Sequence, residues 1–174
     1  MIRPGKVSDL PAIMAIVSDA VQLLKDNQIN QWQNGYPNEA IFAQDIEKKT
    51  CYVYEKDNKV VGVANIDPNR DLSYDVIEQG SWLTDETKGD RYLVVHRLAV
   101  KKEYYHQGIT YELLEFAFAK AKKLHLQSIR VDTHRDNKTM NILLQKMGFV
   151  RCGIIYLVNY LDEDKVRTAY EKVI

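Results

Sequence analysis

The chain has 174 residues, of which 45% are hydrophobic. This length supports one core but not two ordinary domains joined by a linker. Lysine plus arginine and aspartate plus glutamate both number 24, so the bulk charge provides no general attraction for nucleic acid or for an anionic membrane.

The N-terminal segment, the apolar runs and the cysteines indicate the cellular compartment. The start, MIRPGKVSDLPAIM, lacks the continuous apolar segment of a signal peptide, and no run reaches the roughly 18 apolar residues of a membrane span. Cys51 and Cys152 stand far apart and outside any CxxC pair, which disfavours a disulfide framework or a zinc site. We therefore predict a single domain over residues 1–174, cytoplasmic, with two buried and reduced thiols.

The first third of the chain predicts two helices and a hairpin. A short strand near Ile2 leads to Ser8, a suitable N-cap, and the apolar residues that follow recur at helical spacing: Leu10, Ile13, Met14, Val17, Val21 and Leu24. After the break NQWQNGYP, a second helix is predicted over about 38–49. The run CYVYEKDNKVVGVANI predicts a hairpin that turns at Asp57 and Asn58.

The remainder of the chain alternates strands and helices. A polar, irregular segment over 68–90 precedes an apolar strand over 92–100, and Gly108 opens a helix with one apolar stripe. The strand SIRVDTH and a helix over 139–147, ended by Gly148, come next. The strands FVRCGIIYLVNY and VRTAYEKVI close the chain as a hairpin around LDEDK. The order βα(α)ββ and then βαβαββ predicts an α/β fold with a mixed sheet and helices on both faces.

The stretch YYHQGITYELL connects a predicted strand to a predicted helix. Free backbone N–H groups and the positive end of the helix dipole meet there, which suits a phosphate, although an ordinary strand-to-helix turn also uses a glycine. A second strand and helix, RVDTHRDNKTMNILLQKMGF, repeat the arrangement downstream. Adjacent parallel strands whose helices leave the same edge form a crevice at their carboxyl ends, so we expect a ligand site there.

These segments resemble the GNAT superfamily of N-acetyltransferases, which transfer an acetyl group from acetyl-coenzyme A to an amine. The resemblance runs from IRPGKVSDLPAI through NKVVGVANI to DNKTMNILLQKMGF and is strongest from His96 to Gly153. It implies a mostly antiparallel sheet with a central parallel pair of strands. It also implies acetyl-CoA as the co-substrate and the primary amine of a small molecule or peptide as the acceptor.

The family's pyrophosphate loop reads Gln or Arg, x, x, Gly, x, Gly or Ala, and Gly108 matches its central glycine. Tyr105 stands in place of the Gln or Arg and leaves the main-chain N–H groups of the loop unchanged. Thr110 stands in place of the last Gly or Ala, and its side chain either crowds the phosphate or donates a hydrogen bond to it. Asn137 matches a coenzyme-binding asparagine but would equally suit a helix cap. The resemblance thus implies coenzyme contacts from a strand, a loop and a helix start: Leu98, Ala99, Val100, Tyr105, His106, Gln107, Gly108, Ile109, Thr110 and Asn137.

The family's usual source of the leaving-group proton is a tyrosine seven residues after that asparagine, where this chain has Leu144. Loss of a general acid typically costs about 10² to 10⁴ in rate. Tyr156 and Tyr105 are the substitutes we consider. The missing tyrosine also favours an alternative function, an acyl-CoA-binding module with weak or no catalysis, and a third hypothesis is an unrelated α/β nucleotide-binding protein.

His96 is the candidate general base, because it lies on the strand expected to border the acetyl group and titrates near neutral pH. A hydrogen-bonded core histidine is the alternative interpretation. Asp132 and His134 lie near the end of the neighbouring strand, where a base acting through water could also sit.

The acceptor side of the crevice is less well defined. Six acids and two bases between Asp71 and Arg91 either steer a cationic amine or belong to a solvated loop. Three aromatic residues in irregular segments either line the acceptor site or cap the core: Trp32, Tyr36 and Trp82. No nucleic-acid recognition motif accompanies them. We expect no nucleic-acid, membrane or metal partner, and the sequence leaves a homodimer open.

Overall fold

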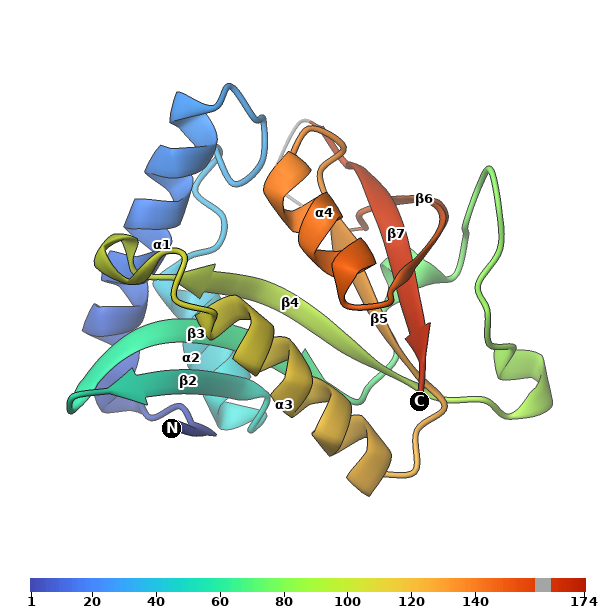
Figure 1. The fold of residues 1–174 in the computed structure, drawn as a ribbon, viewed down its shortest axis with the longest axis horizontal. Coiled ribbons are helices and arrows are strands. Elements are labelled where there is room, and N and C mark those ends of the chain that lie inside the picture. Colours follow the sequence, from blue (N-terminus) through green and yellow to red (C-terminus); the bar gives the residue numbers. More distant parts are fainter. Residues whose placement is uncertain (159–163) are drawn as a thin grey trace.

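The computed structural model describes residues 1–158 and 164–174. They form one twisted sheet with helices packed against it (Figure 1). In these residues the sheet has seven strands in the order β1-β2-β3-β4-β5-β7-β6. Their bounds are β1 (Ile2–Pro4), β2 (Cys51–Lys56), β3 (Lys59–Asp67), β4 (Tyr92–Val100), β5 (Ser128–Thr133), β6 (Val150–Tyr156) and β7 (Val166–Val173). β4 and β5 pair in parallel, and the other described pairs are antiparallel. The predicted mixed sheet with a central parallel pair is confirmed.

Helices cover both faces of the sheet (Figure 1). On one face lie α1 (Leu10–Asp26) and α2 (Glu39–Glu47), and on the other α3 (Ile109–Lys123) and α4 (Lys138–Lys146). α3 buries one stripe at helical spacing: Ile109, Leu113, Leu114, Ala117 and Ala121. It lies close to β3 at Gly62, where an added Cβ would come within 2.9 Å of the Ile109 side chain. The predicted helices on both faces are therefore present.

The predicted N-cap of the first helix, Ser8, is wrong. Asp9 rather than Ser8 occupies the N-cap of α1, because a 3-10 turn, Val7–Asp9, precedes the helix. The Asp9 carboxylate accepts a hydrogen bond from the Lys6 N–H at 2.8 Å, which closes that turn.

Of the two predicted hairpin turns, the first is confirmed. Asp57 and Asn58 have φ values of 50° and 59°, as a two-residue hairpin turn requires. Most of the predicted LDEDK turn lies outside the described residues.

The segment over 68–90 packs across the sheet near β5 and β7. Buried Arg130 on β5 forms an ion pair with buried Glu171 on β7, with Nε and Oε1 at 3.0 Å. The Arg130 guanidinium also lies against the rings of Trp82 and Tyr92, at 4.2 and 3.9 Å from their centroids. Glu171 accepts a hydrogen bond from the Leu83 N–H. This cluster ties the irregular segment to the sheet, and Trp82 caps the core rather than lining a site.

The first helix is apolar along most of its length. By length and composition, Val7–Asp26 is the one helical segment of the described chain that could cross a membrane, a property that it shares with many core helices. Here its apolar residues pack against the sheet: Leu10, Ile13, Ile16, Val17 and Leu24 are buried. Cys51 and Cys152 are buried and unpaired as predicted, and burial raises their pKa values to about 12 and about 11.

Candidate active site

The parallel ladder between β4 and β5 stops partway along the two strands. Its last pair joins Val95 to Val131. Beyond this pair β4 stays with β3, where Ala99 pairs with Val63, and β5 continues on β7. Within the described residues, the edge of β4 that faces β5 has no strand partner over 97–100. Such an edge presents main-chain N–H and C=O groups to an extended ligand.

A β-bulge at Arg97 bends β4 where the two strands separate. Between the pairs made by His96 and Ala99, β4 carries one residue more than β3. Arg97 has a φ of 50°, a left-handed conformation that costs about 1–3 kcal/mol for a residue with a side chain. Its guanidinium is held by Asp45, with bonds of 2.8 and 2.9 Å, and by the Tyr36 hydroxyl at 2.8 Å. Contacts from α2 and from the connection between α1 and α2 therefore fix Arg97 at the bulge.

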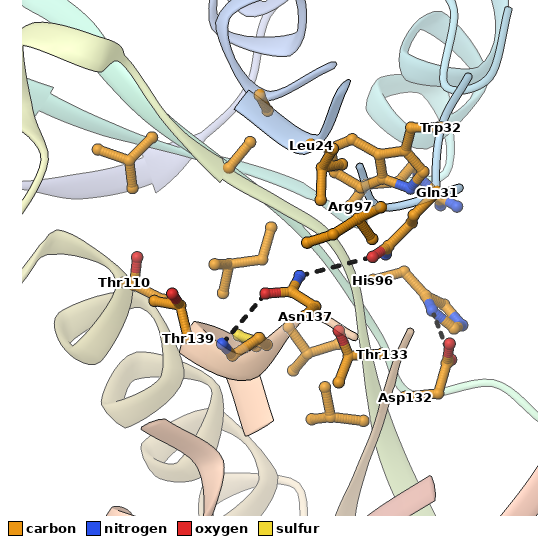
Figure 2. Close-up of a pocket in the computed structure, with 18 of the residues that line it drawn as sticks. Leu24, Gln31, Trp32, His96, Arg97, Thr110, Asp132, Thr133, Asn137 and Thr139 are labelled. Carbon is orange, nitrogen blue, oxygen red and sulfur yellow. Dashed lines mark hydrogen bonds and ion pairs between the residues drawn. The ribbon is translucent and has the colours of Figure 1, made fainter. Parts of the chain in front are cut away.

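A cavity of about 1280 Å³ lies where β4 and β5 separate, a gap that we call the split. We call its first part the helix side, which is lined by the β4 edge and the starts of α3 and α4: Leu98, Ala99, Val100, Tyr105, His106, Gly108, Ile109, Thr110 and Asn137. The second part, the loop side, is lined by Gln31, Trp32, Tyr36, Asp71, His96, Asp132 and Arg167. In Figure 2, Thr110 and Thr139 lie toward one end of the cavity, and His96 and Asp132 toward the other.

The helix side is formed largely by main chain. Gly108 occupies the N-cap of α3 with a φ of 79°, and without a side-chain cap the first N–H groups of the helix stay available. A Cβ added at Gly108 would meet no protein atom within 4 Å, so the space in front of it is open. Of the residues predicted to bind the coenzyme, Gln107 does not line the cavity. Its side chain turns away and accepts a hydrogen bond from Lys56 at 2.9 Å.

Asn137 begins α4 and plays the capping role that the sequence left open. Its Oδ1 accepts a hydrogen bond from the Met140 N–H at 3.2 Å. Its Nδ2 makes a long hydrogen bond of 3.5 Å to Oε1 of Gln31, in the connection between α1 and α2 (Figure 2). Asn137 therefore joins the helix side of the cavity to the loop side.

The loop side holds an ionic cluster around His96, whose side chain is 19% exposed. Nε2 lies 2.7 Å from Oδ2 of Asp71, and Nδ1 lies 3.5 Å from Oδ2 of Asp132. The buried Tyr74 hydroxyl donates to the same Asp132 oxygen at 2.8 Å. Burial alone would raise the pKa of Asp71, but hydrogen bonds from His96 and from the Ser73 N–H lower it to about 2. His96 is thus hydrogen-bonded, as the alternative interpretation expected, and it also faces the cavity.

The two tyrosines considered as acids lie in different places. Tyr156 is 45% exposed, does not line the cavity, and donates its hydroxyl hydrogen bond to Glu78 at 3.1 Å. Tyr105 lines the cavity, and its buried hydroxyl has no hydrogen-bond partner in the described part of the chain. Leu144 lies on α4 and is fully buried in the core. The structure therefore brings Tyr105 to the cavity but not Tyr156.

Of the two alternative bases, Asp132 belongs to the His96 cluster and His134 does not. His134 is buried, its Nδ1 accepts a hydrogen bond from the Asp136 N–H at 3.1 Å, and its Nε2 lies 3.0 Å from Asp164. Nδ1 is therefore used within the connection between β5 and α4, and Nε2 ties the end of β5 to the segment before β7.

Sequence reasoning did not identify Arg97 or Asp45 as parts of the site. The available signals were a single arginine in the apolar run YLVVHRLAV and an acid on the inner face of α2. Tyr36 and Trp32, proposed as lining or capping residues, do line the cavity.

Comparisons with known proteins point to one family. The model of the acetyltransferase (GNAT) family matches residues 17–149. A GNAT-family acetyltransferase from Streptococcus agalactiae 2603 is 29% identical, with a TM-score of 0.87 over 100% of this chain and 95% of that one. A GNAT-family acetyltransferase from Listeria monocytogenes 4b F2365 shares the fold, with a TM-score of 0.73 at 19% identity over 100% and 94% of the two chains. The uncharacterized N-acetyltransferase YesJ of Bacillus subtilis (strain 168) is 24% identical over 152 residues, 86% of this chain and 81% of that protein.

Proposed function

The chain belongs to the GNAT family of acetyltransferases, and on that premise we propose that it moves an acetyl group from acetyl-CoA to the primary amine of a small molecule or peptide. The observation that carries the proposal is the uncapped start of α3 at Gly108 beside the unpaired edge of β4. An anion and an extended amide-containing arm are the two ligand parts that these features suit.

The residues of the helix side fit the coenzyme. Main-chain groups over 98–100 can pair with an amide arm, and the N–H groups over 106–110 can bind the pyrophosphate. Open space in front of Gly108 leaves room for the phosphate, which a larger residue would fill. Acetyl-CoA, when bound, supplies the acyl group as a thioester. Asn137 and Thr110 line the same side and add a side-chain amide and a hydroxyl as further donors.

The residues of the loop side suit the acceptor amine. An amine with a pKa near about 10.4 arrives protonated, and the carboxylates of Asp71 and Asp132 attract that cation. His96, between them, takes the proton so that the neutral amine can attack. For the departing thiolate, Tyr105 is the cavity-lining tyrosine of the two considered, and a thiol with a pKa near roughly 8.5 leaves at a useful rate without an acid.

We also infer a cytoplasmic location. Two buried, unpaired cysteines suit a reducing compartment, in which disulfides are rare.

Two assays test the proposed function. Titration calorimetry should detect acetyl-CoA at submillimolar concentration, and absence of heat would contradict the coenzyme assignment. An amine panel with detection of free thiol should then show turnover on at least one acceptor. Tight coenzyme binding without turnover on any amine would instead support the acyl-CoA-binding module, which the fully buried Leu144 favours.

A further inference from the structure

His96 and Asp132 occupy equivalent places on the two strands that separate. Each is the residue that follows the last pair of the parallel ladder, which joins Val95 to Val131. The segment that follows β3 brings Asp71 to the other side of the imidazole. Three segments therefore place two carboxylates and one histidine at the point where the split begins, and Figure 2 shows His96 and Asp132 facing each other there.

The contact with Asp71 determines which nitrogen of His96 carries a proton. Asp71 is a carboxylate, because its pKa of about 2 keeps it ionised near neutral pH, so it can only accept hydrogen bonds. It lies 2.7 Å from Nε2, and it is itself fixed by the Ser73 N–H at 2.7 Å. Nε2 must therefore carry the hydrogen. In the neutral imidazole the lone pair then resides on Nδ1.

The environment of Nδ1 differs from that of Nε2. Oδ2 of Asp132 lies 3.5 Å from Nδ1, which is an ion-pair distance and too long for a strong hydrogen bond. The Tyr74 hydroxyl holds this oxygen in place at 2.8 Å. A proton that arrives on Nδ1 would therefore gain a carboxylate neighbour, and no donor among residues 1–158 and 164–174 makes a hydrogen bond to Nδ1.

We infer that Asp71 is the positioning residue of His96, and that it directs Nδ1 to receive the proton of the acceptor ammonium. This inference rests on the proposed function. In the step, one N–H bond of the ammonium breaks, its electron pair stays on the amine nitrogen, and the proton bonds to Nδ1. The product is an imidazolium between two carboxylates and a neutral amine.

The other charged groups around His96 leave these two carboxylates dominant. Asp45 of α2 is paired with Arg97, so the two charges cancel next to the imidazole. Tyr74, whose ring centroid lies 5.9 Å from that of His96, is buried. Burial and then the charges of Asp132 and Asp71 raise the pKa of Tyr74 well above its usual value, so it stays a donor. Asp71 and Asp132 are therefore the anions that respond when His96 gains a proton.

The tautomer can be measured on the full chain without any substrate. Nitrogen-15 NMR, with His96 identified among the four histidines by its absence from a His96→Gln variant, should show the hydrogen on Nε2. Asp71→Asn should abolish this single tautomer. The matched control is Asp75→Asn in the same segment, whose partner is Arg70 at 2.8 Å, and it should leave the His96 signals unchanged. A wild-type Nδ1–H tautomer, or an unchanged spectrum in Asp71→Asn, would overturn the inference.

The rate measurement separates this inference from the proposed function. With an amine that the wild type acetylates, Asp71→Asn should lower kcat/KM by about 10²-fold and move the acid limb of the pH–rate profile to lower pH. Asp71→Glu should recover part of the rate, and Asp75→Asn should match the wild type. If no amine is acetylated but His96 shows the expected tautomer, the proposed function and the proton transfer to Nδ1 fail, whereas the orientation of His96 by Asp71 stands. If Asp71→Asn is folded and keeps the wild-type profile, the positioning role is wrong.

Discussion

The two sides of the cavity are built by different means. On the helix side, a left-handed glycine, an uncapped helix start and an unpaired strand edge offer main-chain groups. On the loop side, Asp71, His96 and Asp132 come from three separate segments and act through their side chains. A site made of main chain tolerates changes in side-chain identity but not in backbone space, whereas a site made of side chains depends on each partner. Substitutions on the two sides should therefore impair different properties, coenzyme affinity on the helix side and acetylation rate on the loop side.

The largest expected effect is on the helix side. Gly108→Val should weaken acetyl-CoA binding by at least about 10³-fold, because the added side chain fills the space that the phosphate needs and disfavours φ of 79°. Calorimetry measures this loss.

Gly89→Val is the matched control for Gly108→Val. Gly89 has a φ of 89° and also has no protein atom within 4 Å of an added Cβ, but it does not line the cavity. Both variants should lose similar stability from backbone strain, and Gly89→Val should keep its coenzyme affinity. Equal affinities of the two variants would remove the loop at Gly108 from the coenzyme site.

The second effect is on the loop side and should leave coenzyme binding alone. His96→Ala should lower the acetylation rate at neutral pH by about 10²-fold while the coenzyme affinity changes by less than about threefold. The control is His125→Asn, an exposed histidine beyond the end of α3. A pH–rate profile of His96→Ala that keeps the wild-type shape would show that His96 is not the base.

The same division explains what the sequence could predict. The bounds of β4, the Asp57 and Asn58 turn and the glycine at the start of α3 follow from local spacing and backbone preference, and β4 and this glycine form the helix side. The loop side depends on contacts between residues far apart in the chain. His96 and Asp71 are 25 residues apart, and Arg97 and Asp45 are 52 apart.

Nothing in the local pattern near Asp71 marks it as the partner of a particular histidine. Nor does the pattern show that Arg97 sits in a bulge, because the extra residue of β4 appears only when its pairing with β3 is known. For the same reason, Tyr156 could be considered as an acid from its strand position, although its side chain points to Glu78 on the surface.

The third effect concerns stability at acid pH. The pKa of Asp71 falls from 3.8 to about 2 in the folded protein, so its carboxylate stabilises the fold above about pH 4, and this stabilisation is lost as the pH falls toward 2. A shift of this size corresponds to about 2 kcal/mol. Between pH 6 and pH 2, the wild type should therefore lose about 2 kcal/mol more unfolding free energy than Asp71→Asn. Urea unfolding at the two pH values measures the difference, and parallel losses would contradict it.

The smallest effect tests the residue that joins the two sides. Asn137→Ala removes the Oδ1 that caps α4 and should cost about 1 kcal/mol of unfolding free energy, as the loss of an N-cap typically does. Asn137→Asp keeps an acceptor for the Met140 N–H but replaces the Nδ2 donor by an oxygen. Stability should therefore return to nearly the wild-type value in Asn137→Asp.

Coenzyme affinity then decides what else Asn137 does. If its amide donates to the coenzyme, Asn137→Asp should bind acetyl-CoA less tightly than the wild type although it is equally stable, because a carboxylate cannot donate and repels phosphate. If Asn137 is only a cap, the affinity of Asn137→Asp should change no more than that of Asp26→Asn, an exposed position at the end of α1 outside the cavity lining. An affinity loss confined to Asn137→Asp would show that one side chain, in addition to main-chain groups, binds the coenzyme on the helix side. The two sides of the cavity would then differ in how many side chains they use, because both would use some.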